Sequence, residues 1–298
     1  MEGLDLILYG LMKQYKERVP DVAKVTNAMV DQKVISSSDE ISNDHIAFRT
    51  MGVPHLGIHS LSKVFLKYGY EKKDHFFFEG KRLDAFWYAP PDPRYPRIFI
   101  SELRVQDLPK STQDIIFSYT QEVSSDPVDE LDLNDGNEVS RFLHQPLWRL
   151  PSWDDYQALQ KVSEYAAWVI YNRYYLNHYT ISVHDLRKGY STINEFNCFL
   201  ESIGIVLNDS GGKIKISKDG LLQQSSTVSQ LVEAKFKGGV KKMIPGSYVE
   251  FCERKVLPEF KHLSPDQIKR KHRRDGFETG NADKIFESTY LNQTKKRD

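Results

Sequence analysis

The stretch Asn43-Asp44-His45-Ile46-Ala47-Phe48-Arg49-Thr50 decides how the rest of this chain is organised. Ile46 and Phe48 alternate with His45, Ala47 and Arg49, which is the two-residue period of a half-buried β-strand. A strand rises about 3.3 Å per residue, so the Cα atoms of His45 and Arg49 would lie roughly 13 Å apart on one face. A metal-binding histidine and an anion-binding arginine at that separation could hold the two ends of one small acid. The alternative is an edge strand whose polar face meets solvent.

Composition places the chain among ordinary globular proteins. Of its 298 residues, 40% are hydrophobic and 28% are charged, and the length allows a substantial core. The 41 basic and 41 acidic residues cancel, so no overall field favours nucleic acid or an acidic membrane as a partner. Cys198 and Cys252 lie far apart and predict no disulfide framework. No apolar run approaches the roughly 20 residues of a membrane helix, and the first residues resemble no signal or transit peptide, so we expect a cytoplasmic protein.

The hydrophobic pattern predicts one order of elements that occurs twice. Each copy opens with a strand and a helix and continues with further strands. In the first copy the predicted elements lie at 45–50, 56–68, 71–78, 82–89 and 97–105. In the second they lie at 177–184, 192–203, 205–207, 213–217, 221–228 and 247–254, with a loop before the last strand. The predicted fold class is therefore α+β, with two βαβββ modules that form a cupped sheet able to surround a metal.

We expect a single domain over residues 1–298. Its predicted parts are N-terminal helices at 1–40, the first module at 41–105, a helical insert at 106–176, the second module at 177–254 and a C-terminal segment at 255–298. Within the insert, residues 156–171 are predicted to form one helix. The basic run 269–274 is expected to face solvent, and the pieces 273–278 and 281–284 are expected to fold over the cup.

The inward faces of the predicted strands carry three candidate metal ligands: His45, His178 and Glu250. Two histidines and one carboxylate with open coordination positions are the ligand set of non-haem Fe(II) oxygenases. Residue type alone leaves two alternatives open. His184 shares a predicted strand face with His178, and Glu102 occupies the last strand of the first module as Glu250 does in the second.

Three pieces of sequence carry a resemblance to a known family. Asp44-His45-Ile46-Ala47-Phe48-Arg49, Asn177-His178-Tyr179-Thr180 and Tyr248-Val249-Glu250-Phe251-Cys252-Glu253-Arg254 together resemble the 2-oxoadipate dioxygenase/decarboxylase family, also called 2-hydroxyglutarate synthase. That family is related to the vicinal-oxygen-chelate fold. The resemblance spans most of the chain, from the first helix to Thr289. It implies an enzyme of lysine catabolism that uses Fe(II) and O₂ to convert 2-oxoadipate, or a similar 2-oxo acid, to 2-hydroxyglutarate and CO₂.

The resemblance also implies roles for individual residues. His45, His178 and Glu250 would bind Fe(II), and Arg49 would be the catalytic residue that binds a substrate carboxylate. A glutamine of the stretch 221–227 would line the substrate pocket; Gln224 is preferred, although the adjacent Gln223 leaves the register open. Two other functions fit the same fold: a glyoxalase-like metal-dependent isomerase or lyase, and a non-catalytic protein that binds small molecules. The sequence does not determine the oligomeric state.

Overall fold

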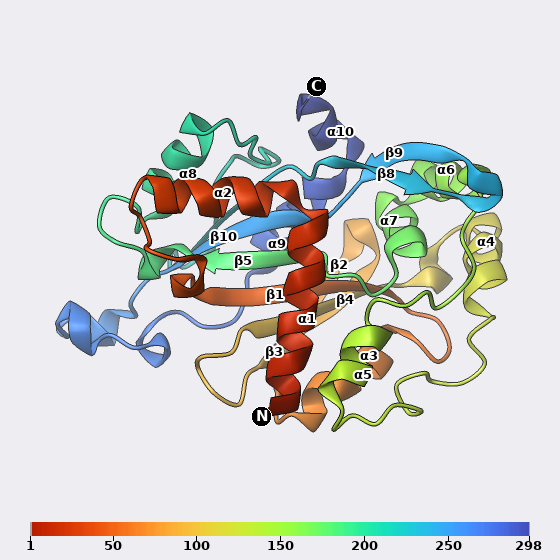
Figure 1. Cartoon of the computed structure of the whole chain (residues 1–298), viewed down its shortest axis with the longest axis horizontal. Helices are drawn as coiled ribbons and strands as arrows, with labels where there is room; N and C mark the ends of the chain where they lie inside the picture. Colours follow the sequence, from red (N-terminus) through yellow and green to blue (C-terminus); the bar gives the residue numbers. More distant parts are fainter. Residues whose placement is uncertain (1, 298) are drawn as a thin grey trace.

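The computed structural model describes residues 2–297 and centres on an eight-stranded sheet with the order β2-β3-β4-β1-β5-β10-β7-β6 (Figure 1). Each predicted module forms one half of this sheet. The first comprises β1 (Asn43–Met51), α3 (Gly57–Lys67), β2 (Glu71–Phe78), β3 (Leu83–Ala89) and β4 (Arg97–Leu103). The second comprises β5 (His178–Ser182), α8 (Ile193–Ser202), β6 (Lys215–Ile216), β7 (Leu222–Ser226) and β10 (Tyr248–Arg254). The predicted α+β fold with two βαβββ modules is confirmed.

The two modules join through their opening strands. β1 and β5 pair antiparallel, with Ala47 opposite His178. On its other side β1 pairs parallel with β4, and β5 likewise pairs parallel with β10. The strand order is therefore mirrored about the junction of β1 and β5. As a result, the strands that carry the candidate ligands lie next to one another in the centre of the sheet.

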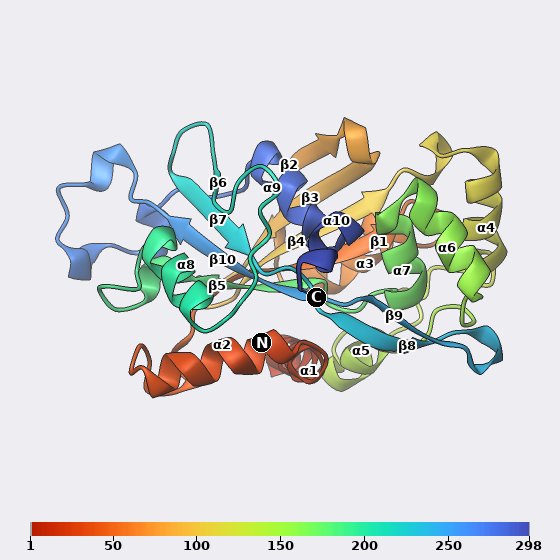
Figure 2. The same ribbon diagram turned by 90° about the horizontal axis from the view of Figure 1, so that it is seen from above.

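The sheet curls into a cup, and helices cover both of its faces. Figure 2 shows α1 (Glu2–Arg18) and α2 (Pro20–Asp31) on the outer side, while α9 (Thr279–Ile285) lies between the raised edges of the sheet. The side chains Leu4, Ile7, Leu11 and Tyr15 are buried on α1 at the three- and four-residue spacing of a helix face. Helix α9 contacts β2 near one edge and β6 and β7 at the other. The C-terminal segment therefore folds over the cup, as expected.

Local sequence accounts for the ends of the module helices. Thr192 and Glu195 form a reciprocal capping box that starts α8. At the end of α3, Gly69 takes a φ of 84°, a left-handed conformation that glycine adopts without steric cost. Each helix then packs its apolar side on the sheet.

The helical insert contains α4 (Lys110–Thr120), α5 (Gly136–Phe142), α6 (Trp153–Val162) and α7 (Glu164–Asn172). The prediction of one helix over 156–171 is wrong. Ser163 breaks it with extended backbone angles, φ −152° and ψ 107°, and its side chain accepts a hydrogen bond from the backbone N–H of Ala166. A serine hydroxyl at this position stabilises the start of a new helix, and the apolar periodicity on both sides concealed that break.

The second module differs from the predicted pattern in two places. Residues 205–207 form no strand and contribute only a single bridge between Leu207 and Thr227, while the strand predicted at 213–217 shortens to β6. The predicted loop before β10 contains a separate hairpin of β8 (Leu231–Lys235) and β9 (Lys241–Pro245). Gly238 and Gly239, both with φ near +78°, form its turn. A glycine pair between two strands is typical of a hairpin turn, and the prediction from sequence did not use it.

The basic run 269–274 is only partly exposed, so the expectation of a solvent-facing stretch is wrong for its arginines. Arg270 donates to the carbonyl oxygens of Pro93 and Tyr95, at 2.7 Å each. Arg273 donates to the carbonyl oxygen of Arg254 at 2.7 Å. These bonds fasten the C-terminal segment to the two halves of the sheet.

Candidate metal and substrate site

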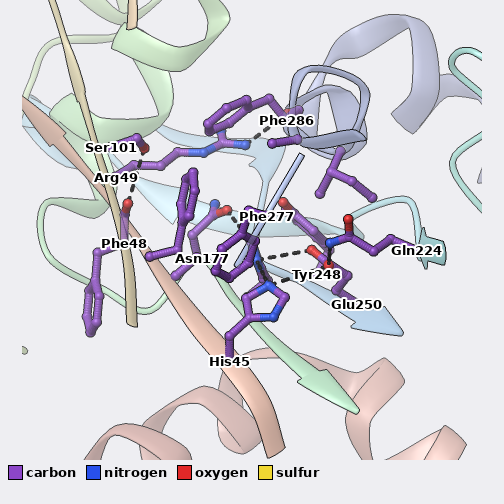
Figure 3. Close-up of a pocket in the computed structure, with 15 residues that line it drawn as sticks. His45, Phe48, Arg49, Ser101, Asn177, Gln224, Tyr248, Glu250, Phe277 and Phe286 are labelled. Carbon is purple, nitrogen blue, oxygen red and sulfur yellow. Dashed lines mark hydrogen bonds and ion pairs between the residues drawn. The ribbon is translucent and has the colours of Figure 1, made fainter. Parts of the chain in front are cut away.

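Three side chains from three central strands converge inside the cup, and Figure 3 labels two of them, His45 and Glu250. His45 lies on β1, His178 on β5 and Glu250 on β10, and all three are buried. Nε2 of His45 is 3.4 Å from Oε1 of Glu250, and Nε2 of His178 is 3.2 Å from Oε2. The two Nε2 atoms are 3.4 Å apart. One ion at about 2.0–2.2 Å from each ligand atom fits these separations.

The hydrogen bonds on the far side of both imidazoles support a metal-binding arrangement. Nδ1 of His45 lies 2.8 Å from Oδ1 of Asp44, and Nδ1 of His178 lies 3.1 Å from Oδ1 of Asn177. Both partners are acceptors, so each Nδ1 carries the proton and each Nε2 presents its lone pair to the centre. Metal-bound histidines are held in this way in proteins generally. The residues present therefore fit a divalent ion.

Electrostatics also favour a cation here. Burial lowers the pKa of His178 well below its ordinary value, and the charges of His45 and Arg49 lower it further, so the imidazole is neutral as metal binding requires. Burial also lowers the pKa of His45, but Glu250 and Asp44 outweigh that effect, and the pKa is raised. The rise in the pKa of His45 reflects two carboxylates that would equally attract a metal ion.

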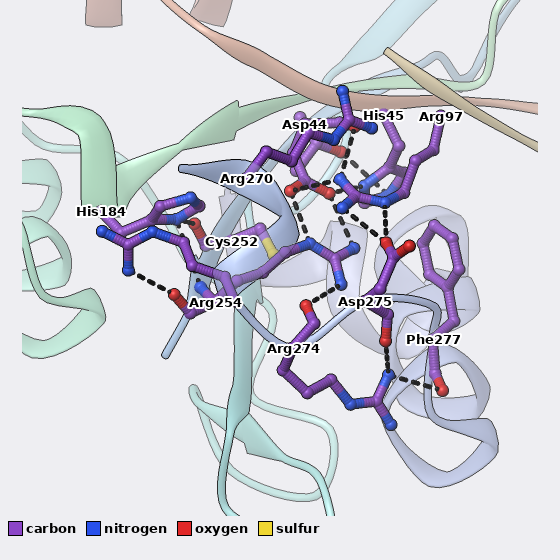
Figure 4. Close-up of polar contacts among 12 residues, drawn as sticks. Asp44, His45, Arg97, His184, Cys252, Arg254, Arg270, Arg274, Asp275 and Phe277 are labelled. Atoms are coloured by element: carbon purple, nitrogen blue, oxygen red, sulfur yellow. Dashed lines mark hydrogen bonds and ion pairs between the residues drawn. The ribbon is translucent and has the colours of Figure 1, made fainter. Parts of the chain in front are cut away.

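Asp44 is itself held by two buried arginines (Figure 4). Nε and Nη2 of Arg254 donate to its two carboxylate oxygens at 2.6 and 2.9 Å, and Nη1 of Arg97 donates at 3.2 Å. Burial raises the pKa of Asp44, but the charges of Arg254 and Arg97 outweigh it and hold the pKa well below its ordinary value. Sequence reasoning missed this network. The sequence feature that could have indicated this network is the acidic residue directly before the candidate ligand His45.

The two alternative candidate ligands, His184 and Glu102, contact other groups. β5 ends at Ser182, so His184 lies in the turn Val183–Asp185, where its Nδ1 is 3.3 Å from the carbonyl oxygen of Cys252. Glu102 accepts a hydrogen bond from the backbone N–H of Ile58 at 2.7 Å and so stabilises the start of α3. Neither side chain reaches the cup. Within residues 2–297, His45, His178 and Glu250 form the one group of ligand-type side chains close enough to share an ion.

Arg49 lines the same pocket, as its shared strand face with His45 predicts. Its Nη1 donates to Oγ1 of Thr289 and its Nη2 to the carbonyl oxygen of Phe286, both at 2.9 Å. The rings of Tyr165, Trp168 and Phe286 lie 5.2–5.5 Å from its guanidinium carbon. In the part of the chain that the structure describes, no carboxylate forms an ion pair with it. A buried cation with neutral partners is suited to binding an anion.

The register of β7 decides between the two glutamines. Gln224 is buried in the pocket, where its Nε2 donates to Oε1 of Glu250 at 2.6 Å and its Oε1 accepts from Nδ2 of Asn281 at 3.0 Å. Gln223 stands opposite Glu253 in the strand pair and points to the other face. Gln224 is therefore the pocket residue, and it contacts a candidate metal ligand.

The C-terminal segment supplies the apolar wall of the pocket. Phe277 packs edge-on against His45 with ring centres 4.8 Å apart. Ala282 and Ile285 of α9, and Phe286 directly after it, continue this wall. These side chains separate the candidate metal ligands from bulk solvent.

A curled sheet of two βαβββ modules around two histidines and a glutamate defines a vicinal-oxygen-chelate-like protein with a candidate metal centre. Residues 7–263 match the family model for 2-oxoadipate dioxygenase/decarboxylase. The chain belongs to this 2-oxoadipate dioxygenase/decarboxylase family, which confirms the resemblance read from the three sequence pieces.

Three relatives show how close the similarity is. The chain is 45% identical to the chloroplastic 2-oxoadipate dioxygenase/decarboxylase of Arabidopsis thaliana, covering 87% of this chain and 71% of the relative. It is also 45% identical to the chloroplastic/amyloplastic enzyme of that name from Oryza sativa subsp. japonica, covering 98% and 80%. The crystal structure of the hydroxyglutarate synthase in complex with 2-oxoadipate from Oryza sativa superposes with a TM-score of 0.88 at 41% identity, covering 97% and 92%.

Both curated relatives are named for plastids, so the expected cytoplasmic location of this chain stays a prediction. Across residues 2–297, no helix has both the length and the apolar character needed to cross a bilayer.

Proposed function

We propose that this protein is an Fe(II)-dependent dioxygenase that converts 2-oxoadipate and O₂ to 2-hydroxyglutarate and CO₂. The observation that supports it most is the convergence of His45, His178 and Glu250 in one closed pocket with Arg49. Two histidines and one carboxylate, with coordination positions left open, are typical of non-haem Fe(II) oxygenases. The family membership and the similar rice structure with bound 2-oxoadipate point to the substrate.

Each part of the pocket has a separate task in this proposal. His45, His178 and Glu250 hold the iron, which when bound supplies the redox chemistry that O₂ requires. Arg49 binds a substrate carboxylate and orients the acid, because a guanidinium is a permanent cation with several donors. The phenylalanines of the C-terminal segment exclude water from the reacting groups.

Gln224 has a supporting task. It donates to Glu250 and in turn accepts from Asn281, so it orients the ligand carboxylate while it lines the substrate space. We also propose that the bound ion is iron and that the enzyme acts in lysine catabolism.

The experiment that tests the function uses the protein purified without O₂ and loaded with Fe(II). On addition of 2-oxoadipate and then O₂, we expect equal amounts of CO₂ and 2-hydroxyglutarate, and none from metal-free protein. A glyoxalase-like isomerase or lyase would turn over without O₂, and a binding protein would return its ligand unchanged. Either of those results would contradict the proposal.

A further inference from the structure

Three hydrogen-bond donors that line the pocket form no hydrogen bond of normal geometry with any of residues 2–297. They are Nε of Arg49, Oη of Tyr248 and Nδ2 of Asn177, and all three atoms are buried. Buried polar groups in proteins are nearly always hydrogen-bonded, so three exceptions around one pocket need a common explanation. Because all three can donate, a ligand rich in acceptors, such as a carboxylate, would satisfy them together.

The orientation of the Asn177 amide follows from the candidate metal centre. If Nε2 of His178 faces the metal, its Nδ1 carries the proton and donates to Oδ1 of Asn177, 3.1 Å away. The amide nitrogen then points elsewhere and remains a donor. Its lack of a partner is therefore a consequence of the metal-binding tautomer, which makes a reversed amide inconsistent with the site.

Tyr248 and Arg49 lie on the same side of the metal ligands. β1 and β10 run in opposite directions, because β5 pairs antiparallel with β1 and parallel with β10. Moving from Glu250 back to Tyr248 therefore follows the same direction as moving from His45 forward to Arg49. Two residues of strand place Tyr248 about 7 Å beyond Glu250 on the same face.

The hydroxyl of Tyr248 faces the charge of Arg49 across the pocket (Figure 3). Burial raises the pKa of Tyr248, whereas the charge of Arg49 and a contact with its side chain oppose that rise. The two groups form no hydrogen bond of normal geometry. Two N–H groups of Arg49 are already held by Thr289 and Phe286, so the guanidinium is fixed in place while Nε remains available.

We propose that the Tyr248 hydroxyl is a substrate-binding donor which, with Arg49, holds the substrate carboxylate that lies farther from the metal ligands. The inference rests on the proposed function and adds a basis for its substrate specificity. A donor pair at that end of the pocket selects 2-oxo acids with a second carboxylate over those that end in a methyl group. An acid without the second carboxylate leaves both donors buried and unsatisfied, which is costly.

Tyr248→Phe removes only the hydroxyl and keeps the aromatic ring. The ring packs against His178 with centres 4.8 Å apart, and phenylalanine keeps that packing. Tyr88→Phe is the matched control. Within residues 2–297 the buried Tyr88 hydroxyl likewise forms no hydrogen bond of normal geometry, but it lies on β3 and outside the pocket. Both variants should melt at or above the wild-type temperature, since each removes an unsatisfied buried hydroxyl.

The test is calorimetric binding without O₂ to Fe(II)-loaded protein, using 2-oxoadipate and 2-oxohexanoate, which has the same number of carbons and lacks the second carboxylate. For Tyr248→Phe we expect Kd for 2-oxoadipate to rise about 10- to 100-fold, as for a lost hydrogen bond to a charged group. Kd for 2-oxohexanoate, and the iron content, should not change. Tyr88→Phe should match wild type with both acids.

Equal weakening of both acids, or of neither, would overturn the assignment of Tyr248 to the second carboxylate. Wild-type turnover of 2-oxoadipate with O₂ is measured in parallel. If the wild type binds 2-oxoadipate but does not convert it, the proposed function fails. The ratio of the Kd of Tyr248→Phe to that of wild type, measured for each of the two acids, still decides the role of Tyr248. The two failures are therefore distinguishable.

Discussion

Asp44 accepts a hydrogen bond from Nδ1 of His45 at 2.8 Å and so fixes which nitrogen of that imidazole faces the cup. The carboxylate is held on its other side by Arg254, 210 residues away in sequence. A candidate ligand is thus oriented through a buried ion pair that joins both modules.

Asp44→Asn should weaken metal binding about 10- to 100-fold, as expected when the carboxylate behind a ligand histidine is lost. It should also lower the free energy of unfolding by about 3–5 kcal/mol, because buried Arg254 loses the carboxylate to which two of its nitrogens donate. Fe(II) titration without O₂, at a temperature where the variant is folded, measures the first effect. Chemical denaturation measures the second.

Asp21→Asn is the control for that experiment. Asp21 is buried, is paired with Arg297 and does not line the pocket, so its loss should destabilise the protein and leave metal affinity unchanged. Wild-type metal affinity in folded Asp44→Asn would show that His45 is oriented without its carboxylate.

His178→Ala should abolish stoichiometric metal binding, because a two-ligand remnant holds iron weakly. His184→Ala should retain one ion per chain, since His184 faces the carbonyl of Cys252 outside the cup. Metal analysis after anaerobic gel filtration separates the two. Loss of the metal ion in His184→Ala would contradict the proposed ligand set.

In wild type, metal at about 100 times its Kd should add about 2.7 kcal/mol to the free energy of unfolding, and a chelator should remove that increment.

Arg49→Ala should bind iron normally and lose most turnover, with about 2–5 kcal/mol of transition-state stabilisation removed, by analogy with buried charge contacts. Arg49→Lys should restore only part of it, because an ammonium cannot reproduce the guanidinium donors. Steady-state kinetics and iron content check both.

Arg173→Lys is the matched control for Arg49. Arg173 is also buried and donates to the carbonyl oxygens of Trp148 and Tyr171, away from the site. The Arg173→Lys variant should have a lower free energy of unfolding and the wild-type turnover rate. If folded Arg49→Ala turned over at the wild-type rate, Arg49 would have only a structural role.

Lys215 predicts a pH dependence of stability in the metal-free protein. Burial lowers its pKa to about 8, whereas the unfolded chain keeps the ordinary value near 10.4. Between these values the unfolded state binds more protons, so the free energy of unfolding should rise with pH, by at most about 3 kcal/mol in total. Denaturation curves from pH 7 to 10 should show this rise in wild type and in Lys213→Met, an exposed control, and lose it in Lys215→Met. A flat wild-type curve would contradict the assignment.

The sequence by itself determined the features that depend on local periodicity. The alternation around His45 predicted β1 and placed Arg49 on the same face, and the order of strands and helices predicted both modules. These inferences succeed because the face a side chain takes on a strand follows from its position in that strand. Where periodicity was interrupted by a capping serine at Ser163, or replaced by the turn of Gly238 and Gly239, the same reasoning failed.

Only the tertiary structure decided which side chains meet. Glu250 and Glu102 both lie in the last strand of their module, yet Glu250 alone reaches the histidines. Glu250 stands opposite Thr180, two residues past His178, whereas Glu102 stands opposite Thr50, five residues past His45, and turns to the start of α3. The contact of Asp44 with Arg254 and the closure of the pocket by the C-terminal segment join parts of the chain that lie far apart. Strand register, sheet curvature and the ends of strands set these contacts, and they are fixed by packing of the whole core, which no local pattern encodes.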